Sequence, residues 1–213
     1  MSCRFDMDHY VELLDAATAG GYEWAAFDRP PRAGDVFLRH DVDLSLEAAL
    51  QMARVERDLG VRATYFLMTG SAFYNLDSQV GRYALRQLRL WGHAVGQHPA
   101  YPHVDRNGRF DKVLAWHNPE PEYMSEPIDG LANVMAPPYF ATGLYRSDSN
   151  CHWREGCPHE ELAAGAFEWL QLLVHPEIWV YDGETMGQTM RSMLDAKRGD
   201  WLGYLANDRI DLE

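Results

Sequence analysis

Four short apolar runs along the chain each end at an Asp or a His, and this recurrence strongly limits the possible folds. The first run, residues 36–38, leads into Arg39-His40-Asp41-Val42-Asp43, and three later runs end at His98, His117 and His175. Segments with helical periodicity lie between most of these runs, which is typical of parallel strands joined by crossover helices. The carboxyl ends of parallel strands meet at one edge of a sheet. The sequence therefore predicts an α/β fold with one polar site at that edge.

The predicted elements alternate along most of the chain. Helices are expected where apolar residues recur every three or four positions, and strands where apolar, β-branched or aromatic residues run together. Neither an internal repeat nor a low-complexity linker interrupts this pattern, so we predict a single domain. Predicted helices cover residues 8–19, 46–59, 79–91, 160–169 and part of 184–205, and predicted strands cover residues 36–38, 63–68, 94–97, 113–116, 131–135 and 170–174.

Composition restricts the partners and the setting of the chain. A length of 213 residues is enough for one domain with a sizeable core. The net charge of −13 argues against nucleic acid or an anionic membrane surface as the main partner. Neither a signal peptide nor a membrane span is evident, and Cys3, Cys151 and Cys157 form an odd, small set typical of reduced thiols. We therefore expect a cytoplasmic protein, and the sequence leaves its oligomeric state open.

Asp41 and Asp43 are two residues apart at the end of the first strand, so their side chains should project to the same side. Neighbouring carboxylates repel one another, which raises one pKa unless a cation or hydrogen bonds hold them. Asp residues also cap helices that follow strands, but Ser45 can already cap the next helix here. The pair therefore favours a metal site or a catalytic role.

Five short segments, each weakly specific alone, follow one another in an informative order. They are residues 40–43, 60–67, 92–98, 147–153 and 172–176. Together they resemble the motifs of the polysaccharide deacetylases, also described as the NodB-homology or carbohydrate esterase family 4 domain. The resemblance extends over most of the chain, and the first segment is a variant because Val42 separates its two acidic residues.

The resemblance implies a distorted (β/α) barrel of about seven parallel strands. Residues 1–35 would form an N-terminal helix and lead-in, residues 36–180 the catalytic core, and residues 181–213 would carry a C-terminal helix. The implied activity is metal-dependent hydrolysis of carbon–nitrogen bonds other than peptide bonds. The substrate would be a small molecule or glycan precursor that carries an N-acetyl group.

The resemblance also implies roles for individual residues. Asp41 would be the general base, Asp43 and His98 would bind the metal, His175 would be the general acid, and Asp148 would orient His175. The implied cofactor is one divalent metal ion, for which zinc is expected and nickel, cobalt or manganese are alternatives. Such an ion polarises an amide carbonyl, while a base and an acid with separated pKa values move the protons.

Two positions depart from the family pattern. The family's metal histidines are four residues apart, whereas His103 follows His98 by five residues, with two prolines between them. His103 is the expected third ligand, and His117 and Asp105 are the alternatives. The family's third motif usually offers an Arg that steadies the base, but the corresponding strand here ends at His117. That histidine could support the base, contact the substrate or bind the metal.

Further residues and functions remain as alternatives. His40 and Trp153 are candidates for binding or supporting the substrate, although an aromatic side chain such as Trp153 is equally expected in a core. A small zinc site formed by residues 151–152 and 157–159 is disfavoured, because the usual CxxC pair is missing. The alternative functions are a catalytically inactive carbohydrate-binding or scaffold barrel and a hydrolase of a non-sugar amide.

Overall fold

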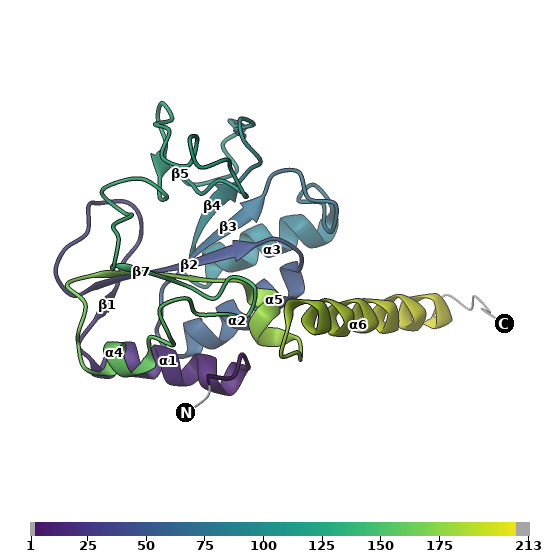
Figure 1. Cartoon of the computed structure of the whole chain (residues 1–213). Coiled ribbons are helices and arrows are strands. Elements are labelled where there is room, and N and C mark those ends of the chain that lie inside the picture. The colour runs from purple at the N-terminus through teal and green to yellow at the C-terminus, as the bar shows by residue number, and fades with distance from the viewer. Residues whose placement is uncertain (1–2, 208–213) are drawn as a thin grey trace.

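A curled sheet of seven parallel strands forms half of a barrel at the centre of the molecule (Figure 1). The structure is a computed structural model that describes residues 3–207. The strands of the half-barrel are, in chain order, β2 (Asp35–Val42), β3 (Thr64–Met68), β4 (Ala94–His98), β5 (Val113–Leu114), β6 (Ala132–Asn133), β7 (Tyr145–Ser147) and β8 (Leu170–Val174). Their order across the sheet is β6–β5–β4–β3–β2–β8–β7, and the short β1 (Glu23–Trp24) pairs in parallel with the start of β2. The predicted α/β fold with a distorted (β/α) barrel is confirmed at this level.

Alternation along β2 separates the two faces of the sheet. All eight residues of this strand are buried, because its two faces adjoin different apolar clusters. Leu38 packs in the larger cluster, which includes apolar residues of the helices, and Phe37 packs in the smaller cluster on the concave side. Since side chains alternate along a strand, Arg39 and Asp41 share the concave side with Phe37, whereas His40 lies on the helix side.

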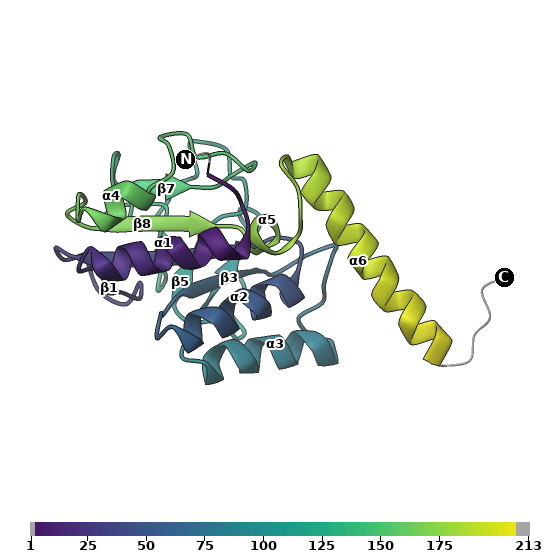
Figure 2. The same cartoon turned by 90° about the horizontal axis from the view of Figure 1, so that it is seen from below.

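Helices α1 (Met7–Ala19), α2 (Leu46–Asp58) and α3 (Gln79–Leu90) lie side by side along the convex face (Figure 2). Each begins at a capping side chain, and these caps are Asp6, Ser45 and Ser78. The predicted cap is confirmed, because Oγ of Ser45 accepts a hydrogen bond from the backbone N–H of Ala48 at 3.1 Å. A cap at this position starts α2 directly after the polar end of β2.

The short elements depart most from the predictions. The predicted helix over residues 160–169 is wrong beyond its first turn, because α4 (His159–Ala163) ends before Gly165, which adopts φ +63° in the left-handed region. The strands predicted at 113–116 and 131–135 are two residues long in the structure. β7 and α5 (Pro176–Val180) were not predicted, because three to five residues carry too little periodicity.

The C-terminal helix α6 (Met186–Asn207) extends away from the sheet, as Figures 1 and 2 both show. Within the described part of this helix, Thr189 and Met193 are the buried residues, and both lie in its first half. Across residues 3–207, no helix combines the length and the apolar character needed to cross a membrane.

Candidate functional site

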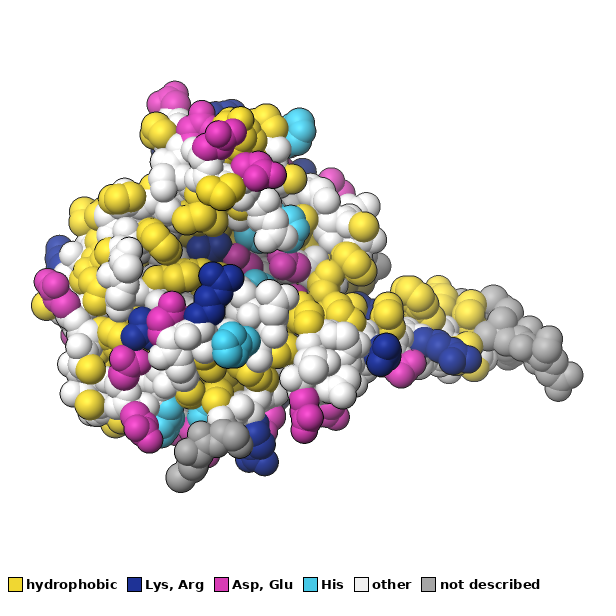
Figure 3. Space-filling view, in the orientation of Figure 1, with side chains coloured by type: hydrophobic (Ala, Val, Ile, Leu, Met, Phe, Trp, Pro, Cys, Tyr) yellow, Lys and Arg dark blue, Asp and Glu magenta, His cyan; other side chains and the backbone are white. Residues whose placement is uncertain are grey.

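The carboxyl ends of four strands bring together polar side chains. Asp43 follows β2, His98 ends β4, His117 follows β5, and His175 follows β8. One carboxylate oxygen of Asp43 and one ring nitrogen each of His98 and His117 lie within 4.8 Å of one another. Figure 3 shows acidic and histidine side chains gathered in a hollow between the protruding loops around β5 and the body of the sheet. The predicted convergence at this edge therefore occurs.

The ring of His98 is oriented by the backbone. Its Nδ1 lies 2.7 Å from the carbonyl oxygen of Ala115. A carbonyl oxygen can only accept a hydrogen bond, so Nδ1 carries a proton and donates it. In the neutral ring Nε2 then presents a lone pair, 3.2 Å from Oδ1 of Asp43. Metal-binding histidines have this arrangement, in which one ring nitrogen donates to a carbonyl and the other directs its lone pair toward the metal.

His117 brings a third ligand atom to the same point. Its Nδ1 lies 3.3 Å from Oδ1 of Asp43 and 3.2 Å from Nε2 of His98. Oδ1 of Asp43 is buried and accepts no hydrogen bond from the described residues. Burial opposes ionisation, but protonated rings of His117 and His98 would, in the absence of a cation, hold the pKa of the Asp43 carboxyl well below its usual range. A buried anionic oxygen without a donor, between two imidazole nitrogens, fits a divalent cation.

His103, the predicted third ligand, lies outside this ligand group. Its side chain is exposed, and its backbone N–H bonds to the carbonyl of Ala100 in a turn of the loop after β4. In a regular helical turn, two histidines four residues apart lie on the same face. The prolines of this loop prevent such a turn. Asp105, the other alternative, forms an ion pair with Arg109 at 3.0 Å. His117 is therefore the residue that the geometry places beside Asp43.

Asp41 is held by Arg39, a contact that sequence analysis missed. Nε and Nη2 of Arg39 donate to the two oxygens of Asp41 at 2.8 and 2.6 Å, and both side chains are buried. Burial opposes ionisation, but Arg39, followed by His98, holds the pKa of Asp41 below its usual range. The signal was present in the sequence, because residues two apart on a strand point the same way. The family pattern places an arginine that steadies the base on another strand, where this chain has His117, and here Arg39 of β2 contacts Asp41 instead.

His175 is oriented by Asp148, which follows β7. Nδ1 of His175 lies 2.6 Å from Oδ1 of Asp148, and the backbone N–H of His175 donates to Oδ2 at 2.9 Å. Trp179 donates from Nε1 to the same Oδ2 at 2.7 Å. Burial lowers the pKa of His175 but the negative charge of Asp148 outweighs it, and the pKa rises to about 10. The ring is therefore protonated at neutral pH.

Glu177 is a further residue that the sequence did not reveal. Its carboxyl group is fully buried, and neither oxygen has a hydrogen-bond partner in the part of the chain that the structure describes. Burial raises the pKa of Glu177 to about 8, while the positive charge of His175 opposes the rise. An acidic residue in the first turn of a helix is usually exposed, so nothing in the sequence indicated that Glu177 is buried.

His40 and Trp153, predicted to support or bind the substrate, lie in the core instead. His40 is on the helix side of β2, where its Nε2 is 2.7 Å from Oε1 of Glu56. Trp153 stacks on Phe5, with ring centroids 6.1 Å apart, and is buried. Strand alternation explains the first correction, since His40 must face away from Asp41.

A cavity of about 340 Å³ has Arg39, the hydrogen-bond partner of Asp41, in its wall. Tyr145, Ser147 and Phe140 contribute hydroxyl groups and an aromatic face. A larger cavity of about 630 Å³ lies at the opposite, amino end of the strands, near Thr64 and far from the ligand group. The smaller cavity is therefore the one of these two that is linked to Asp41, through Arg39.

Comparison of the chain with protein-family models, with curated proteins and with solved structures finds no match. The resemblance to polysaccharide deacetylases therefore rests on the five sequence segments. A functional conclusion depends in turn on the chemistry that the grouped side chains can perform.

Proposed function

We propose that the protein is a metal-dependent hydrolase that cleaves carbon–nitrogen amide bonds other than peptide bonds and removes the acetyl group from an N-acetylated sugar or glycan precursor. The observation that carries the proposal is the grouping of three functions at one sheet edge. Asp43, His98 and His117 supply ligand atoms, Asp41 is an ionised carboxylate, and His175 is a protonated acid. Together these three could polarise the amide carbonyl, take a proton from water and protonate the departing amine.

One divalent cation would be held by Asp43, His98 and His117. One carboxylate and two imidazoles form a ligand set that suits zinc, with cobalt, nickel or manganese as alternatives. When bound, the cation supplies Lewis acidity toward an amide carbonyl and toward water. The backbone carbonyl of Ala115 keeps the ring of His98 in the tautomer that such binding needs.

Asp41 acts as the general base. Oδ2 of this residue lies 3.6 Å from Nε2 of His98, so the carboxylate borders the ligand group without belonging to it. Two hydrogen bonds from Arg39 keep the carboxylate ionised and fix its direction. It can therefore take the proton of a water molecule that attacks the amide carbon.

His175 acts as the general acid. Asp148 binds the Nδ1 side of the ring, which leaves Nε2 as the nitrogen that can give a proton to the departing amine. Without that proton the leaving group would be an amide anion, which is a very poor one. The negative charge of Asp148 ensures that His175 carries the proton at neutral pH.

The cavity that Arg39 lines favours a sugar as the rest of the substrate. Its volume of about 340 Å³ falls within the roughly 300–1,000 Å³ of small-molecule sites. Ser147, Ser149 and Tyr145 offer hydroxyl groups, and Phe140 offers an apolar ring. A pyranose matches this wall, because it presents hydroxyl groups at its edge and an apolar face.

Metal analysis combined with acetate release tests the proposal. The probe substrates are N-acetylglucosamine, its short oligomers and a simple aryl acetamide. Asp41→Asn should keep the metal and lose about 10²–10⁴-fold in rate, because general base catalysis is removed. His117→Ala should bind one ion fewer than the wild type, whereas His103→Ala, a matched histidine outside the group, should bind the same number. An equal metal content in the two histidine variants, or full turnover in Asp41→Asn, would refute the proposed site.

A further inference from the structure

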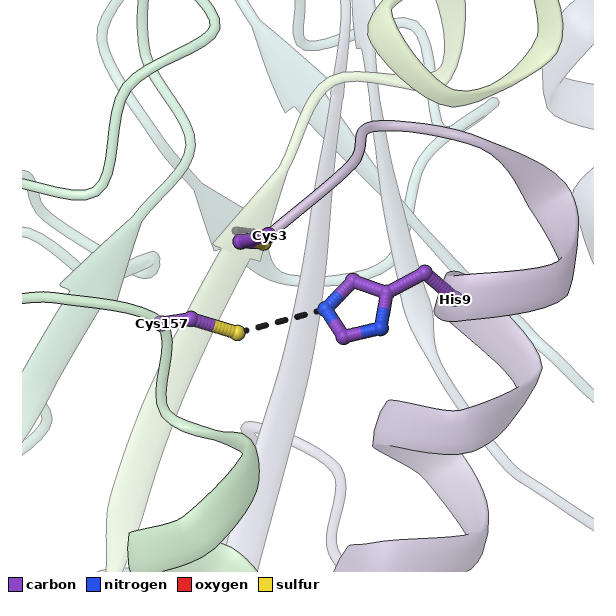
Figure 4. Close-up of side chains that lie close together, drawn as sticks. All are labelled: Cys3, His9 and Cys157. Atoms are coloured by element: carbon purple, nitrogen blue, oxygen red, sulfur yellow. Dashed lines mark hydrogen bonds between the residues drawn. The ribbon is translucent and has the colours of Figure 1, made fainter. Parts of the chain in front are cut away.

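A second group of metal-ligating side chains lies apart from the sheet edge. Sγ of Cys3, a ring nitrogen of His9 and Sγ of Cys157 lie within 4.8 Å of one another, and all three residues are half-buried. Figure 4 shows them facing one another from three segments, namely the N-terminal arm, α1 and the loop before α4. The chain thus brings two thiols and an imidazole together across about 150 residues of sequence.

His9 has the orientation of a ligand. Its Nε2 lies 3.3 Å from Sγ of Cys157, and its Nδ1 lies 2.8 Å from Oε2 of Glu12 on the next turn of α1. A carboxylate accepts the Nδ1 proton, so Nε2 is left facing the sulfur. A carboxylate behind a histidine fixes the tautomer and raises the basicity of the ligating nitrogen in metal sites.

The thiols of Cys3 and Cys157 contact other side chains of this group, whereas the third thiol, that of Cys151, does not. Nε1 of Trp153 donates to Sγ of Cys3 at 3.2 Å, which fixes the position of that sulfur. Sγ of Cys157 in turn faces Nε2 of His9 at 3.3 Å. Cys151 lies elsewhere, with its Sγ 3.9 Å from Oγ1 of Thr189. The site formed by residues 151–152 and 157–159 was disfavoured from the sequence, and the fold places Cys157 beside Cys3 and His9 instead.

We propose that Cys3, His9 and Cys157 bind a thiophilic divalent cation, zinc in the cell, at a structural site. Two thiolates and one imidazole favour zinc over calcium, magnesium or manganese, which prefer oxygen ligands. His159 is a candidate for the fourth position, since its ring centroid is 5.8 Å from that of His9. Binding displaces the thiol protons to solvent, so the affinity should increase with pH.

Such a site would tie the N-terminal arm to the loop that carries Asp148. Trp153 bonds to Cys3 and also packs beside Trp179, with ring centroids 6.3 Å apart. Trp179 in turn donates to Asp148. A cation bound by Cys3 and Cys157 would therefore stabilise the packing around Asp148. Several side chains separate it from Asp148, so it would take no part in catalysis. The inference is independent of the proposed function.

Cobalt(II) added to reduced, metal-free full-length protein tests this site directly. Thiolate ligands give cobalt a strong near-ultraviolet charge-transfer absorption, which ligands with only nitrogen and oxygen do not give. The wild type should show this absorption, and so should Cys151→Ser, the matched cysteine outside the group. Cys3→Ser and Cys157→Ser should each weaken or abolish it, and Asp43→Ala, which disrupts the other ligand group, should retain it. Glu12→Gln should weaken the cobalt affinity by about 10–100-fold.

Two outcomes would overturn the proposal. The first is the absence of thiolate–cobalt absorption in the reduced wild type. The second is the same absorption in Cys3→Ser and Cys157→Ser as in the wild type. Circular dichroism of every variant establishes that it is folded. The first outcome has a specific form. If Cys3 and Cys157 form a disulfide in the aerobically purified protein and the reduced protein binds no cobalt, the two cysteines are a redox pair and not a metal site.

Discussion

Two carboxyl groups near the carboxyl edge of the sheet have opposite environments. Asp41 accepts two hydrogen bonds from Arg39, and its pKa is lowered as a result, despite burial. Glu177 is equally buried but has no donor among residues 3–207, and burial raises its pKa to about 8. Near neutral pH the first is an anion and the second is mostly a neutral acid. Groups with separated pKa values are a frequent mark of acid–base sites.

Glu177→Gln should change how stability depends on pH. The folded pKa of about 8 lies above the ordinary value of 4.5, so the folded protein holds this proton more tightly than the unfolded chain. The contribution of Glu177 to the free energy of unfolding therefore falls as pH rises from about 4.5 to about 8, by at most about 1.4 kcal/mol per pH unit. Glutamine resembles the neutral acid and should remove this fall.

Urea unfolding at pH 5 and pH 8 measures the effect. The loss of stability between the two pH values should be smaller in Glu177→Gln than in the wild type. Glu160→Gln, an exposed acid in the first turn of α4, serves as the control and should leave the loss unchanged. Equal losses in Glu177→Gln and the wild type would show that Glu177 is ionised in the folded protein at pH 5 as well.

Strand alternation made part of the site predictable at this scale. It puts Asp41 and Asp43 on one side, and the position of Asp43, His98 and His175 at or just after the ends of parallel strands places them at the carboxyl edge. The same rule predicts that Arg39 faces Asp41, although that inference was not drawn. The choice between His103 and His117 was beyond the sequence, since it depends on the path of the loop after β4.

Among the elements, α2 is fastened to the sheet by one buried carboxylate. Glu56 accepts hydrogen bonds from the hydroxyl groups of Tyr10 on α1 at 2.5 Å and Tyr65 on β3 at 2.8 Å. Nε2 of His40 on β2 lies 2.7 Å from the same carboxylate. Two helices and two strands therefore meet at Glu56. This is the role that the structure gives to His40, in place of a role at the site.

Glu56→Gln should lower the free energy of unfolding by about 1.5–3 kcal/mol, because hydrogen bonds to a buried charge are lost. Urea unfolding at pH 7 measures the change. Asp58→Asn on the same helix is the matched control and should stay within about 0.5 kcal/mol of the wild type, since its ion pair with Arg57 is exposed. A Glu56 variant no less stable than the Asp58 variant would mean that these contacts contribute nothing.

Long elements were predictable and short ones were not. The predicted helix over residues 8–19 corresponds to α1 at Met7–Ala19, because more than three turns of apolar recurrence and a Gly-Gly end leave little freedom. β5 and β6 are two residues each, so their pairing in the sheet determines them more than their own sequence does. The paths of the loops between β4 and β7 therefore could not be predicted from the sequence.

At the scale of the whole molecule, the fold keeps two kinds of ligand chemistry apart. The carboxyl edge of the half-barrel gathers one carboxylate and two imidazoles, and the N-terminal side gathers two thiols and one imidazole. Neither group is local in sequence, because each takes ligands from three separate segments. Both groups therefore depend on the complete sheet and helix layer, and neither is expected to survive as an isolated fragment.

The helix α6 should contribute to stability through its first half alone. Met193 is 2% exposed, whereas its neighbour Leu194 is 56% exposed, so the two residues form a matched pair. Met193→Ala should cost about 2–5 kcal/mol of unfolding free energy, the usual loss for a buried Met. Leu194→Ala should stay within about 0.5 kcal/mol of the wild type. Urea unfolding of the isolated protein at low concentration measures both.

Trp201→Ala extends the test to the second half of the helix. Trp201 is 68% exposed, so this variant should also stay within about 0.5 kcal/mol of the wild type. An exposed apolar side chain gains nothing from the folded state unless another surface covers it. If Leu194→Ala destabilises the protein as strongly as Met193→Ala, that side chain is buried in solution, and α6 is packed against a surface that the single chain does not provide.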